Sequence, residues 1–111
     1  MATIYVKREI TQRQMSDMGS GFGEYTFSEP VDLASFLHYY KKNSKAWGTV
    51  TILNWQGEIV RKFDFNTYHG DTPQFYVNLD GWYEKCKVKS AEFSYCFMSE
   101  DLTIRLEKYN V

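Results

Sequence analysis

Only two histidines could take part in acid–base chemistry in this chain, His38 and His69. His69 lies in the segment NTYHGDTP (residues 66–73), which brings a histidine, Asp71, two threonine hydroxyls, a tyrosine and a glycine onto one loop, as an active site would. However, Asp-Thr-Pro after a glycine is also ordinary turn chemistry, and no serine or cysteine has a local nucleophile signature. A small enzyme centred on His69 and Asp71 is therefore a third hypothesis, and we expect that the chain is not an enzyme.

Metal and nucleotide sites lack the residue patterns that they need. Cys86 and Cys96 match no common zinc-binding spacing, so we expect two reduced thiols on or under strands. The segment GSGFG (residues 19–23) is not followed by Lys-Ser/Thr and does not lead directly from a strand into a helix, as a phosphate-binding loop would. We expect neither a metal nor a cofactor.

A stripe of lysines precedes an aromatic run in KCKVKSAEFSYCF (residues 85–97). Cys86 and Val88 take the inward side of this stretch, and the lysines between and beside them, Lys85, Lys87 and Lys89, point outward. Such lysines usually protect an exposed sheet edge from pairing with other chains. They could instead contact the phosphates of a single-stranded nucleic acid, with nearby aromatic rings stacking on its bases. Edge protection is the preferred interpretation, because two glutamates flank the stripe.

The bulk composition predicts one globular domain over residues 1–111. The chain is 43% hydrophobic and 24% charged, with no low-complexity run, and its size allows a sizeable buried core. The formal net charge of −1 gives no strong overall attraction for phosphate backbones or anionic membranes. No apolar run approaches the ~20 residues that cross a bilayer, so we expect a cytoplasmic protein. Aromatic residues make up 18% of the chain, more than one small core readily hides.

The N-terminal third alternates between strand and helix signals. Residues 3–10 have the period of a half-buried strand, residues 11–23 have no periodicity and predict a flexible loop, and residues 24–27 form a short extended piece. A helix is expected over about 30–43, capped by Ser28 or Glu29, because apolar residues then recur at helical spacing.

After the helix, the sequence predicts antiparallel hairpins. Residues 46–55 and 58–65 flank Gln56-Gly57, with a register that the sequence leaves open, and Asp80-Gly81 predicts a second hairpin between two extended runs. In the last hairpin, a four-residue turn at 98–101 would place Phe93, Tyr95 and Phe97 opposite three aliphatic residues, Leu106, Ile104 and Leu102. The change of phase at Ser90-Ala91 suggests a bulge.

These elements predict an α+β domain with one helix packed on a curved, mostly antiparallel β-meander sheet. Their order is similar to that of cystatin-like folds, but no motif of that family accompanies it, and topology alone carries no function. One helix covers only two or three strands at their spacing of ~4.8 Å. We therefore expect the sheet either to curl around the helix or to leave an apolar face for a second copy or another protein.

The preferred function is a small non-enzymatic protein-interaction module of the adaptor or inhibitor type, of a kind that mobile elements carry. It would bind a protein partner, or itself as a homodimer, through an exposed aromatic sheet face, because tryptophan and tyrosine commonly anchor protein interfaces. The predicted binding residues are Trp47, Trp55, Trp82 and Tyr83. The alternative is a single-stranded nucleic-acid-binding protein that uses the stripe of Lys85, Lys87 and Lys89 with the nearby aromatic residues.

Overall fold

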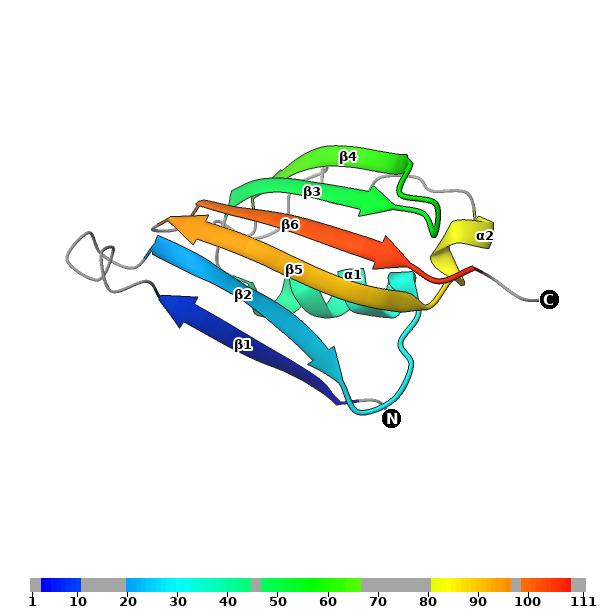
Figure 1. Cartoon of the computed structure of the whole chain (residues 1–111), viewed down its shortest axis with the longest axis horizontal. Helices are drawn as coiled ribbons and strands as arrows, with labels where there is room; N and C mark the ends of the chain where they lie inside the picture. Colours follow the sequence, from blue (N-terminus) through cyan, green and yellow to red (C-terminus); the bar gives the residue numbers. More distant parts are fainter. Residues whose placement is uncertain (1–2, 11–19, 45–46, 67–80, 97–98, 109–111) are drawn as a thin grey trace.

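The computed structural model describes residues 3–10, 20–44, 47–66, 81–96 and 99–108 of the chain. Six strands and two helices occupy these residues (Figure 1). The strands are β1 (Ile4–Ile10), β2 (Ser20–Phe27), β3 (Trp47–Leu53), β4 (Ile59–Asn66), β5 (Val88–Cys96) and β6 (Ser99–Leu106). The helices are α1 (Leu33–Asn43) and the single turn α2 (Gly81–Glu84). The α+β class that the composition and patterning predict is confirmed.

The strands form one sheet in the order β1-β2-β5-β6-β3-β4. Three antiparallel hairpins lie side by side, and the third, β5–β6, is inserted between the first and the second. Strands β3 and β6 pair in parallel, and the other neighbours pair antiparallel. The predicted meander is therefore wrong, although the sheet is mostly antiparallel. Helix α1 makes this order possible, because it carries the chain past the inserted hairpin from β2 to β3.

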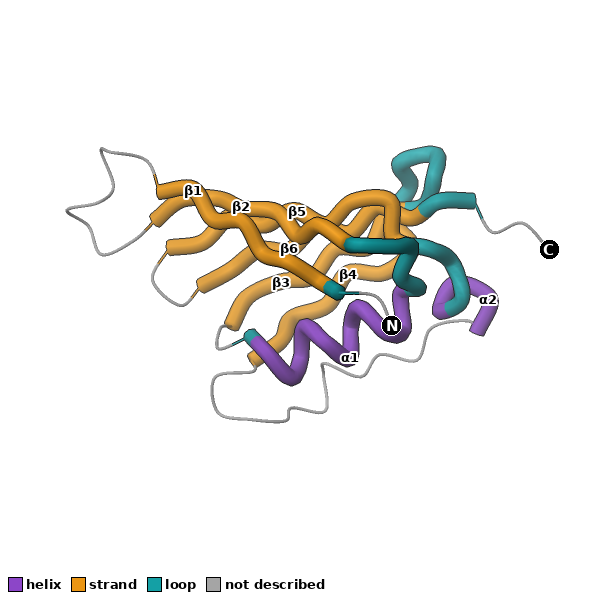
Figure 2. The backbone as a smooth tube through the Cα atoms, turned by 90° about the horizontal axis from the view of Figure 1, so that it is seen from below, coloured by secondary structure: helices purple, strands orange, loops and turns teal. Residues whose placement is uncertain are grey.

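Helix α1 covers one face of the sheet, below it in the view of Figure 2. Its N-cap is Asp32, whose side chain accepts a hydrogen bond from the backbone N–H of Ser35. The predicted start near residue 30 and the predicted caps Ser28 and Glu29 are wrong. The carbonyl of Val31 accepts a hydrogen bond from the N–H of Val88 instead of one from within a helix, so Val31 precedes the helix.

The core lies between α1 and the inner face of the sheet. Its helical side consists of Leu33, Phe36 and Tyr40, which are fully buried at the predicted helical spacing. Every strand from β2 to β6 contributes buried side chains to the opposite wall. These are Tyr25, Val50, Ile52, Phe65, Val88, Ala91, Phe93, Leu102, Ile104 and Leu106. The helix and its flanking segments thus hide more of the sheet than the width of one helix would suggest.

The β3–β4 hairpin is confirmed, and the structure settles its register. Val50 lies opposite Phe63 and Ile52 opposite Arg61, with an irregularity between Ile52 and Leu53. Gly57 in the connecting turn has a φ of 84°, a conformation that glycine adopts without strain.

In the last hairpin, the described side chains lie on the predicted faces, but the predicted pairing is wrong; Phe97 lies outside the described residues. Phe93 lies opposite Leu102 rather than Leu106, and Cys96 pairs with Ser99. The turn is therefore shorter than the predicted residues 98–101. The predicted bulge is confirmed, because the register of β5 and β6 shifts between Val88 and Ser90.

Two predicted local structures differ from the structure. Residues 20–23, predicted to end a flexible loop, are the first part of β2; the rest of that predicted loop, 11–19, lies outside the described residues. Residues 81–84, predicted as the second strand of an Asp80-Gly81 hairpin, form α2. The first strand predicted for that hairpin lies in 67–80, also outside the described residues. Of the two described helices, neither is long and apolar enough to cross a membrane.

Candidate functional site

Strand β1 is an edge strand of the sheet, and β2 is its one neighbouring strand among the described residues (Figure 1). Two large apolar side chains at its N-terminal half are exposed: 54% of Tyr5 and 45% of Val6 is accessible. The pairing with β2 sets Val6 opposite the buried Tyr25, so Val6 lies on the inner face of the sheet and Tyr5 on the outer face. Exposed apolar residues on an edge strand are a recognised template for pairing with another chain.

The backbone groups that β1 offers at this edge follow from its register. The N–H of Ser28 donates to the carbonyl of Thr3 over 2.9 Å, so Thr3 and Ser28 form a hydrogen-bonded pair. In an antiparallel ladder such pairs alternate, which means that Tyr5 also directs its N–H and C=O toward β2. Ile4 and Val6 therefore direct their backbone groups away from β2, toward the edge of the sheet, while their side chains lie on its inner face.

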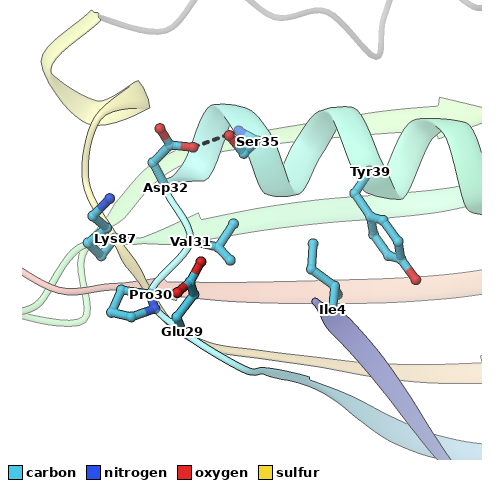
Figure 3. Close-up of a pocket in the computed structure, with 8 residues that line it drawn as sticks. All are labelled: Ile4, Glu29, Pro30, Val31, Asp32, Ser35, Tyr39 and Lys87. Atoms are coloured by element: carbon cyan, nitrogen blue, oxygen red, sulfur yellow. Dashed lines mark hydrogen bonds between the residues drawn. The ribbon is translucent and has the colours of Figure 1, made fainter. Parts of the chain in front are cut away.

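A groove of about 410 Å³ opens beside the start of β1 (Figure 3). Its apolar lining comes from three segments that are distant in sequence: the first residue of β1, the connection before α1, and α1 itself. These residues are Ile4, Pro30, Val31 and Tyr39. In Figure 3, Ile4 and Tyr39 lie at one end of the groove, and the charged residues extend toward the other.

The charged part of the groove consists of Glu29, Asp32 and Lys87, together with the hydroxyl of Ser35. Asp32 is held in place because it caps α1, with 2.9 Å between its Oδ1 and the N–H of Ser35. The backbones of Asp32 and Lys87 form an isolated antiparallel bridge, which brings the lysine against the start of the helix. The lining of the groove thus includes two carboxylates and one ammonium group.

A second polar cluster lies inside the core. The hydroxyl of Tyr40 donates a short hydrogen bond to Oε2 of Glu100, and the two residues are 0% and 2% exposed. Burial, and then the charge of Glu100, raise the pKa of Tyr40 above its ordinary value. A substrate could not reach this pair without unfolding part of the core, so the pair is structural.

The predicted binding residues fall into two groups at opposite ends of β3. Trp55, Trp82 and Tyr83 come together, with ring centroids of Trp55 and Trp82 5.3 Å apart and those of Trp82 and Tyr83 4.9 Å apart. All three are half-buried and pack on the core. They lie in the β3–β4 turn and in α2, not on a sheet face. Trp47, at the start of β3, is 42% exposed.

The outer face of the central strands is polar rather than aromatic. Its side chains include Glu92 of β5 and Arg105 of β6, whose Oε1 and Nε lie 3.7 Å apart. Beside Trp47, the exposed aromatic residues of the described strands are Tyr5 and Phe22. Strands β5 and β6 separate these two from Trp47, so the described outer face carries no continuous aromatic patch.

The side chains of Lys85, Lys87 and Lys89 are exposed and those of Cys86 and Val88 are buried, as the alternation predicted. The explanation as edge protection is wrong, however, because β5 lies in the interior of the sheet. The backbone of this stretch is paired on both sides: Cys86 accepts from the N–H of Leu33, and Lys87 accepts from the N–H of Glu107.

Two histidines and two cysteines were considered for acid–base chemistry and metal binding. His38 is exposed on α1, whereas His69 and Asp71 lie outside the described residues. Cys86 is buried and Cys96 exposed, and both are free thiols. Within the described part of the chain, no group of three or more histidine, cysteine or acidic side chains could hold a metal ion.

The groove was not predicted, although the sequence carries a partial signal of it. Ile4, Tyr5 and Val6 are three consecutive bulky residues in a strand that was expected to bury only one face. The chain has no significant match to any protein-family model, curated protein or solved structure.

Proposed function

We propose that this chain is a protein-interaction module that binds an extended segment of a protein by adding it as a strand to the open edge of β1. The observation that carries the proposal is the coincidence of three features at the start of β1: exposed apolar side chains, outward backbone groups and an adjacent groove. In this mode of recognition, main-chain hydrogen bonds supply affinity, and pockets for alternate side chains supply specificity.

The geometry of β1 favours this mode. The backbone donors and acceptors available for pairing belong to Ile4 and Val6, and Ile4 also lines the groove. A strand added here would direct every second side chain to the inner face, as Ile4 and Val6 do. One such side chain would lie over the groove, between Ile4 and Tyr39.

The opposite edge of the sheet is less suited to strand addition. Strand β4 exposes the charged side chains of Arg61, Lys62 and Asp64 in its middle. Charges of this kind are a common means of discouraging edge-to-edge pairing. Ile59 is exposed at the start of β4, but the bulged end of the hairpin interrupts the ladder there.

The aromatic residues that the sequence suggested as binding residues contribute more directly to the stability of the fold than to the binding of a partner. Trp55 and Trp82 pack against each other and on the core, so their replacement would disturb the end of the sheet. Trp47 is accessible but lies far from β1 in the strand order. We therefore place the binding surface at β1 and its groove, and retain Trp47 as a peripheral candidate.

A peptide-display selection tests the proposal without knowledge of the natural partner. Random short peptides are selected on the immobilised protein and then tested on the Val6→Pro variant, which lacks one outward N–H of β1. Because Val6 directs that N–H away from β2, the substitution should leave the β1–β2 ladder intact. We expect selected peptides to bind the unmodified protein and to lose binding to Val6→Pro. Peptides that bind both proteins equally would refute binding at this edge.

A further inference from the structure

We draw no further inference here: the strongest candidate, the groove beside the start of β1 that Ile4, Val31 and Tyr39 line, belongs to the site already described, and nothing in the described part of the chain shows what covers it.

Discussion

Replacing Tyr40 by phenylalanine removes one hydroxyl from the core and no ring. The hydroxyl donates to Oε2 of Glu100, and both residues are almost completely buried. Phenylalanine keeps the ring contacts of Tyr40 with Tyr25, Phe36 and Phe65. The substitution therefore isolates the contribution of the hydroxyl to the free energy of unfolding.

The magnitude follows from the burial of the acceptor. Leaving a buried acceptor without its donor costs about 1–3 kcal/mol, so we expect a loss of about 2 kcal/mol. For a chain of 111 residues, an unfolding entropy of about 2.1 cal/mol/K per residue gives ~0.23 kcal/mol/K in total. The melting temperature should then fall by about 9 °C.

Chemical denaturation and thermal melting followed by circular dichroism measure this loss. Tyr39→Phe is the matched control, because Tyr39 is the neighbouring, half-buried tyrosine at the groove. It should change the free energy of unfolding by less than ~0.5 kcal/mol. Combining Tyr40→Phe with Glu100→Leu removes donor and acceptor together, so the double variant should be less destabilised than the sum of the single variants. If Tyr40→Phe were as stable as the unmodified chain, the assignment of this hydrogen bond as structural would be wrong.

The remaining predictions concern alkaline pH, a glycine in the sheet and the aromatic residues. Because the folded chain raises the pKa of Tyr40 above the unfolded value of about 10, stability is intact below pH ~10 and falls above it. Denaturation measured at a series of pH values should show this fall, and the free energy of unfolding of Tyr40→Phe should fall less steeply, by up to ~1.4 kcal/mol per pH unit. A Cβ at Gly48, where φ is 156°, would lie 1.8 Å from a backbone oxygen of β6, so Gly48→Ala should cost about 3 kcal/mol or more. Gly57→Ala meets no atom within 4 Å and should cost only about 1–2 kcal/mol for its positive φ. Trp55→Ala should lower the free energy of unfolding by about 2 kcal/mol, and the more exposed Trp47→Ala by less; a Trp55→Ala variant of unchanged stability would contradict its packing on the core.

Local patterns predicted the elements of the fold, but not the order of the strands. Alternation identified β1, the β3–β4 hairpin and the faces of β5 and β6, and helical spacing identified the buried face of α1. Hairpin signals act between neighbouring segments, whereas the insertion of β5–β6 between the other hairpins depends on the parallel pairing of β3 with β6. That pairing joins residues about fifty positions apart, and no local signal records it.

Glu100 explains why the predicted register of the last hairpin was incorrect. Two acidic residues after Ser99 are typical of a turn, and the prediction placed Glu100 in the turn at 98–101. The structure places it inside the sheet, because the hydroxyl of Tyr40 on α1 provides a buried donor. A polar residue with a distant partner is therefore indistinguishable, in the sequence, from one that is solvated.

The candidate site was even less accessible to sequence reasoning. The groove unites β1, the residues before α1, and Lys87, which are far apart in the chain. Lys87 was singled out, but as part of a stripe for edge protection or phosphate binding. The choice of tryptophans also failed to anticipate that Trp55 and Trp82 would pack against each other at the end of the sheet.

The most direct test of the central claim is the binding of display-selected peptides to the unmodified chain and to Val6→Pro, measured by fluorescence anisotropy with circular dichroism as the check of folding. The account predicts saturable binding to the unmodified chain and loss of binding to a folded Val6→Pro, with Val6→Ala retaining most of it. Equal binding to a folded Val6→Pro, or no peptide that binds the unmodified chain, would contradict strand addition at β1.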